Sequence, residues 1–177
     1  HWRQALEGAP PLLELDMASA RPAVPSFRGG LHRVLVPPSV ARLLRAVCRQ
    51  EGSTLFMGML AVFKLLLHKH SGRLDLIVGS GVANRRRLES ESIMGMMLNT
   101  VVLRTRLDGD PSFCEMLARV RRTTLDAYAN QDLPFERVVE ATRATRDLRY
   151  NPLAQVMFSF HDAPLPDMDV GELRVEV

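Results

Sequence analysis

The stretch Asn130–Glu136 (Asn-Gln-Asp-Leu-Pro-Phe-Glu) most constrains the fold, because it separates two amphipathic runs. A residue before proline is pushed out of the α region, so Leu133 ends the first run. Pro134 then suits the first position of a new helix, with Asp132 placed to cap it. The sequence therefore predicts a long helix before this stretch and a short helix over Phe135–Thr142.

The rest of the chain alternates strand-like and helix-like segments. Expected strands are Leu31–Val36, Leu74–Gly79, Leu98–Leu107, Ala154–Phe160 and Leu173–Val177. Expected helices start at Ser39, at Ser53 or Thr54, and at Asp110-Pro111, where Asp110 caps and Pro111 is the first helical residue. The pattern predicts an α/β (α+β) two-layer sandwich, in which a mixed sheet of four to six strands is covered by two long helices.

Composition excludes several classes of function. The basic run Arg85-Arg86-Arg87 has no interleaved aromatics, which favours a solvated loop over a nucleic-acid surface. The longest apolar stretch, Leu55–Leu67, is too short for a membrane span and contains Lys64; it predicts a buried helix. Cys48 and Cys114 lie far apart without metal-site spacing, so we expect a reducing cytoplasm and no metal.

Residues with catalytic chemistry are few. His68 and His70 are two positions apart and do not share a helical face, and Gly79-Ser80-Gly81 lacks the rest of a phosphate loop. His161-Asp162 offers an acid–base pair without an obvious nucleophile. Two interpretations of Met94, Met96 and Met97 stay open, either core packing or the lining of a flexible apolar channel.

Three stretches in order resemble the motifs of one enzyme family. Residues 94–104 resemble Ile-Gly-x-Phe-Val-Asn-Thr-Gln-x-x-Arg, matching at Gly95, Asn99, Thr100 and Arg104. Residues 130–136 resemble His/Asn-Gln-Asp-Tyr-Pro-Phe-Glu, and residues 146–153 resemble Arg-Asp-x-Ser-Arg-Asn-Pro-Leu. The chain thus resembles the condensation domains of nonribosomal peptide synthetases.

The resemblance implies one of the two chloramphenicol-acetyltransferase-like lobes of such a domain. The paired-histidine motif of the first lobe, His-His-x-x-x-Asp-Gly, is absent from this sequence, so no catalytic residue is expected here. Residues 1–30 would be an irregular connector from the N-terminal lobe, and residues 31–177 the C-terminal lobe. The missing initiator methionine and the strand-like end suggest a piece of a longer chain, inactive alone and exposing an apolar face.

The family reaction joins carrier-bound substrates by attack of an acceptor amine on a donor thioester. The resemblance assigns this lobe a wall of the substrate tunnel, formed by Ser80, Gly81, Met96, Met97, Asn99 and Gln131. It assigns structural roles to Gly95, Arg104, Asp132, Pro134, Arg146, Asp147 and Asn151. Implied partners are the N-terminal lobe, donor and acceptor carrier domains that bring phosphopantetheine, and an adenylation domain; no cofactor is bound, and neither nucleic acid nor membrane is a partner.

Two alternatives from other classes remain open. One is a stand-alone coenzyme A-dependent acyltransferase with His161-Asp162 as its base. The other is a non-catalytic module that docks carrier proteins, for which the run Arg85–Arg87 would be a contact surface.

Overall fold

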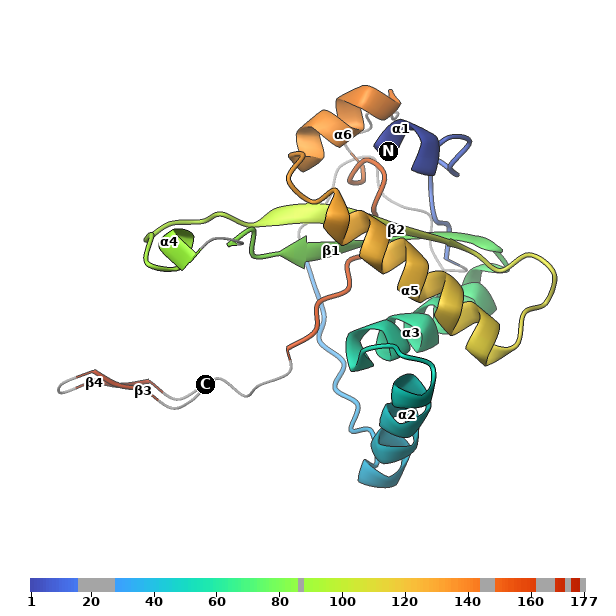
Figure 1. The fold of residues 1–177 in the computed structure, drawn as a ribbon, viewed down its shortest axis with the longest axis horizontal. Coiled ribbons are helices and arrows are strands. Elements are labelled where there is room, and N and C mark those ends of the chain that lie inside the picture. Colours follow the sequence, from blue (N-terminus) through green and yellow to red (C-terminus); the bar gives the residue numbers. More distant parts are fainter. Residues whose placement is uncertain (16–27, 86–87, 144–148, 162–167, 171–172, 176–177) are drawn as a thin grey trace.

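The computed structural model describes residues 1–15, 28–85, 88–143, 149–161, 168–170 and 173–175. Figure 1 shows the order of the elements along the chain. The helices are α1 (Trp2–Ala5), α2 (Pro38–Gln50), α3 (Leu55–Ser71), α4 (Leu88–Glu91), α5 (Phe113–Ala129) and α6 (Phe135–Thr142). The strands are β1 (Asp75–Val82), β2 (Asn99–Arg106), β3 (Met168–Val170) and β4 (Leu173–Val175).

The sheet is mixed but smaller than predicted. β1 and β2 pair antiparallel from Asp75 opposite Arg106 to Val82 opposite Asn99. The run Ala154–Phe160 adds a single parallel bridge, in which Gly79 N donates to Val156 O at 2.9 Å. β3 and β4 pair only with each other.

The strand expected at Leu31–Val36 is wrong. This segment has no regular secondary structure and is exposed, with Leu35 at 90% of its full exposure. Its alternation is imperfect, since His32, Val34 and Val36 fall on one face, and within the described residues no strand edge pairs with it. Val40 and Leu43 of α2 are exposed nearby, so this part of the molecule presents an apolar surface.

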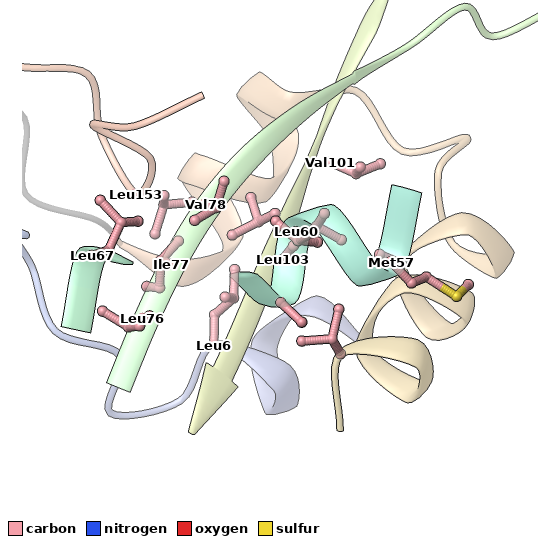
Figure 2. Close-up of a cluster of buried hydrophobic side chains, with 14 of the residues drawn as sticks. Leu6, Met57, Leu60, Leu67, Leu76, Ile77, Val78, Val101, Leu103 and Leu153 are labelled. Carbon is pink, nitrogen blue, oxygen red and sulfur yellow. The ribbon is translucent and has the colours of Figure 1, made fainter. Parts of the chain in front are cut away.

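Helices cover the sheet from two sides. Figure 1 shows α2 and α3 on one side of the β1–β2 ribbon and α1 and α6 on the other. α3 contacts both α5 and β1, α5 contacts β2, and α1 packs against α6. Figure 2 shows the apolar core between them, where leucines of α3 meet the side chains of both strands. The core also includes Trp2, Leu6 and Leu13, from the segment predicted to be a connector.

Local capping chemistry sets the helix ends. Thr54 caps α3 by accepting Met57 N, and Gly72 ends that helix with a φ of +66°, both as predicted. The predicted caps at Ser39 and Asp110 are wrong. α2 begins at Pro38 with Pro37 as N-cap. α5 begins at Phe113, where Ser112 and Glu115 form a capping box that satisfies two backbone N–H groups.

The buried helix α3 carries a lysine inside the core. Lys64 is fully buried, and its Nζ donates to Leu103 O at 2.8 Å and to Thr105 Oγ1 at 2.7 Å, both on β2. Burial lowers the pKa of Lys64 to about 7, with the charge of Asp75 acting in the opposite direction. Lys64 therefore ties α3 to β2 through polar bonds within an apolar layer.

Candidate functional site

The stretches resembling two family motifs meet in one cleft. This cleft has a volume of about 200 Å³ and lies where the start of β2 meets the start of α6. We call it the motif cleft. Its lining consists of Asn84, Leu98, Asn99, Thr100, Asp132, Pro134, Phe135 and Glu136. The fold thus brings together residues that are about 30 positions apart in sequence.

Asn99 holds the motif cleft together. Its Nδ2 donates to Gln131 O at 2.7 Å and to Leu133 O at 2.9 Å, while its Oδ1 accepts Thr100 N and Phe135 N. These four bonds use both donors and both acceptor sites of the amide. Asn99 therefore acts on its surroundings by fixing the 131–135 loop.

The start of α6 differs slightly from the prediction. Pro134 is its N-cap rather than its first residue, and helix α6 begins at Phe135. The first helical N–H, that of Phe135, finds its acceptor on Asn99 of β2 rather than on the predicted cap, Asp132. The helix start is thus built by a distant strand as well as by the local proline.

The opposite end of the Asn130–Glu136 stretch is held from α1. Trp2 is buried, and its Nε1 donates to Asn130 O at 3.1 Å. The Gln131 side chain is half-buried, and its Nε2 donates to Tyr128 O at 2.7 Å. The stretch is therefore fixed by α1, by the end of α5 and by β2.

Ser80 and Gly81 lie inside β1 rather than in a loop after it. Ser80 is buried, and its Oγ donates to Phe158 O at 3.0 Å. Gly81 is exposed, and a Cβ placed there would meet no atom within 4 Å. Gly81 therefore leaves the open space next to the strand that the sequence predicted, whereas the Ser80 hydroxyl bonds within the fold.

An arginine organises the loop that follows β1. Arg85 donates to the carbonyl oxygens of Ser90, Ile93 and Gly95, the last two at 2.8 Å. The solvated role predicted for the 85–87 run does not hold for Arg85; Arg86 and Arg87 lie outside the described residues. No local sequence signal distinguishes Arg85, because its acceptors are backbone carbonyls.

The methionines of this loop point away from the core. Met94 and Met96 are exposed at 96% and 88%, and Met97 is half-buried. The core-packing interpretation is therefore wrong for Met94 and Met96. Gly95 between them has a φ of +142°, a conformation that a side chain would disfavour, which explains the glycine at this motif position.

Arg104 braces the sheet as its predicted structural role implies. Its Nε and Nη2 bond the Asp75 carboxylate, with the shortest distance 2.7 Å, and its Nη1 donates to Ala5 O and Glu7 O. Burial alone would raise the pKa of Asp75, but the hydrogen bond and charge of Arg104, helped by Arg106, hold it below its ordinary value. The pair anchors the N-terminal segment to β1 and β2.

The remaining predicted residues give less. Arg146 and Asp147 lie outside the described residues. The backbone carbonyl of Asn151 accepts from Gln155 Nε2 at 3.0 Å, within a turn. Ser159 Oγ lies 3.2 Å from His161 Nε2, so the structure places a hydroxyl beside that histidine; Asp162 is outside the described residues.

Two searches of the described residues give negative results. They contain no group of three or more His, Cys, Asp or Glu side chains arranged to hold a metal ion. The helices they form include none with the length and apolar character needed to cross a membrane.

Known proteins similar to this chain are parts of peptide synthetases. A linear gramicidin synthase of Brevibacillus parabrevis is 44% identical over 176 residues, which are 99% of this chain but 2% of that protein. Phosphinothricin tripeptide synthetase PhsC of Streptomyces viridochromogenes is 43% identical over 162 residues, 92% of this chain and 15% of that protein. The chain therefore spans only a small part of these relatives.

Solved structures agree. A four-domain nonribosomal peptide synthetase bound to AMP and glycine matches with a TM-score of 0.86 and 30% identity, over 92% of this chain and 12% of that one. The X-domain from teicoplanin biosynthesis, in its complex with OxyB, matches with a TM-score of 0.86 and 28% identity, over 93% of this chain and 37% of that one. These likenesses confirm the predicted chloramphenicol-acetyltransferase-like α/β fold.

The family model described as "Condensation domain" matches residues 1–175. Together the matches favour the condensation family over both a stand-alone acyltransferase and a docking module. The chain corresponds to the C-terminal part of the domain. It therefore belongs to the condensation domain family.

Proposed function

We propose that this chain forms one wall of the site in which a condensation domain makes an amide bond. The observation that carries the proposal is the motif cleft, where Asn99 joins the start of β2 to the 131–135 loop. Family membership supplies the reaction class: an acyltransferase that forms peptide bonds.

In this reaction the acceptor amine attacks the carbonyl carbon of the donor thioester. A C–N bond forms, the C–S bond breaks, the thiol leaves and the amine loses a proton. A thioester is already activated, so the largest demand on the protein is to position the two substrates. A cleft whose loop is held at both ends suits that demand, because its walls keep one geometry.

The polar lining suggests how the wall contacts substrate. Asp132 and Glu136 bring carboxylates to the motif cleft, and Asn84 brings an amide. We assign these groups to the acceptor side, where an amine or ammonium group would meet acceptors of hydrogen bonds. Because the Asn99 amide is fully used, its contribution to the tunnel is to place the loop, whereas Ser80, Gly81, Met96, Met97 and Gln131 remain proposed lining residues.

The partners follow from the same proposal. Donor and acceptor carrier domains would deliver substrates on phosphopantetheine arms, the N-terminal lobe would supply the paired histidines, and an adenylation domain would load the carrier. The chain alone would then be inactive and would associate through the exposed apolar surface around Leu35 and Leu43. Cytoplasmic location stays a prediction.

A single-turnover assay tests the proposal, with the product read by the intact mass of the acceptor carrier. One arm uses the chain joined to its native upstream sequence, and the other uses the chain alone. We expect product only in the joined form. Product from the chain alone would contradict the proposed division of labour and would direct attention to Ser159 and His161.

Variants of the joined form test the motif cleft itself. Asp132→Asn and Glu136→Gln should slow amide formation at least about tenfold if the carboxylates orient the acceptor. Glu140→Gln is the matched control, because Glu140 is exposed on the same helix outside the cleft lining. Equal rates in all three variants would remove the carboxylates from the mechanism.

A further inference from the structure

A second, larger depression lies between α1, β2 and α5. Its volume is about 500 Å³, and four arginines line it: Arg104, Arg106, Arg119 and Arg122. We call it the arginine groove. The one carboxylate in its lining is Glu7, while Asp75 pairs with Arg104 and Arg106 from beside it. We propose that the arginine groove docks an acidic protein segment.

The four arginines have different roles. Arg104 forms the floor, since its guanidinium is committed to Asp75 and to two backbone carbonyls. Arg119 is held in place by Nη1, which donates to Arg106 O and Asp108 O at 2.9 and 3.0 Å. Those bonds occupy one of its nitrogens, so the guanidinium is oriented in advance and keeps other donors.

Two arginines reach into solvent. Arg122 is exposed and lies three residues after Arg119 on α5, so both project from the same helical face. The side chain of Arg106 is 60% exposed and reaches Asp75 through Nε only, at 3.4 Å. The groove thus offers guanidinium groups from a strand and from a helix, and their planar forks match carboxylates.

The chemistry of the lining selects among anions. Compact phosphate sites use converging backbone N–H groups, whereas the groove presents side chains spread over two elements. Its lining contains no aromatic residue on which nucleic-acid bases would stack. Several carboxylates along one protein segment fit this arrangement better than a single small anion.

The setting of the chain makes such a segment available. The linear gramicidin synthase relative matches this chain over only 2% of its length, so its polypeptide carries much additional sequence. A segment on the same polypeptide acts at an effective concentration in the millimolar range, so a weak groove suffices. The inference is independent of amide formation, because docking is measured by binding.

The test uses the intact condensation domain that contains this chain, with a fluorescent peptide of alternating Glu and Ser as the probe. Anisotropy is measured at about 50 mM and about 300 mM salt, since exposed charge pairs are screened at the higher value. We expect Arg122→Glu to weaken binding about tenfold or more. Arg45→Glu, on an exposed position of α2, makes the same change of charge away from the groove and should change binding less than about twofold.

Three outcomes would overturn the proposal. Equal weakening by Arg45→Glu would show attraction to net charge alone. Equal affinity for a peptide with Gln in place of Glu would remove the role of carboxylates. Displacement of the peptide by inorganic phosphate, at concentrations where chloride has no effect, would identify a small-anion site. A circular dichroism spectrum of each variant confirms that the fold is intact.

Discussion

Asn99 Oδ1 accepts the backbone N–H of Phe135 at 3.0 Å, so a residue at the start of β2 completes the start of α6. The same amide donates to the carbonyls of Gln131 and Leu133 on the preceding loop. Two stretches that resemble separate family motifs are therefore one structural unit. Their spacing in the family follows from this contact as much as from any contact with substrate.

Asn99→Ala should destabilise the domain by about 1–3 kcal/mol, because it leaves the Phe135 N–H and two carbonyls without their partner. Asn99→Asp keeps the acceptor but sets a carboxylate oxygen against those carbonyls, so it should be at least as harmful. Urea unfolding measures both changes. Asn130→Ala is the control, since that amide makes one bond, to Asp126 O at 2.9 Å. Losses no larger than those of the control would refute the clasp.

Arg85→Lys should loosen the loop of residues 88–95 while preserving the charge. A lysine ammonium cannot reproduce the fork that joins the carbonyls of Ser90, Ile93 and Gly95. Hydrogen exchange followed by mass spectrometry should show faster exchange across this loop and unchanged exchange in α3. Arg45→Lys on α2 is the matched control, and unchanged exchange in the loop would assign its order to other contacts.

The sequence predicts those parts of the fold that local chemistry determines. The bounds of α6 agree with the prediction because Leu133-Pro134 breaks the chain locally. The strand at Leu31–Val36 failed because β structure depends on a partner that a pattern does not contain. The α5 cap was misplaced by two residues, since Asp110-Pro111 competed with the stronger Ser112–Glu115 box.

The site was predictable as a set of residues but not as a set of roles. Asn99 and Gln131 stand out as amides, yet the partners of Asn99 lie 32 to 36 residues away. Arg85 has no signature, because it bonds backbone oxygens that every residue carries. Lys64 was visible as a charge in an apolar helix, but its acceptors on β2 required the tertiary structure.

Gly58→Ala tests the packing of α2 on α3. A Cβ at Gly58 would overlap Cys48 Sγ, so the gain in helix propensity of about 1 kcal/mol is opposed by an overpacking cost of about 1–3 kcal/mol. We expect net destabilisation in urea. The double variant with Cys48→Ala removes the overlapping sulfur and should be more stable than the sum of the single changes. Additive effects would show that the two positions do not contact.

Lys64→Met should change how stability depends on pH. The folded pKa of Lys64 is about 7, whereas its ordinary value is 10.5, so between these values the unfolded chain binds the proton more tightly. Stability due to this residue therefore rises with pH across that window, by at most about 1.4 kcal/mol per pH unit. Below pH 7 both states are protonated, and the folded state bears the full desolvation cost.

Urea unfolding at about pH 7.5 and about pH 9.5 measures the effect, taken as the difference between wild type and variant to cancel other titrating groups. The free energy of unfolding of the wild type should rise relative to that of Lys64→Met. Lys69→Met is the control, because Lys69 is exposed on the same helix and should leave the profile parallel to the wild type. Parallel profiles for Lys64→Met as well would show that Lys64 keeps its proton in the core, and that the bonds to Leu103 and Thr105 support an ammonium group.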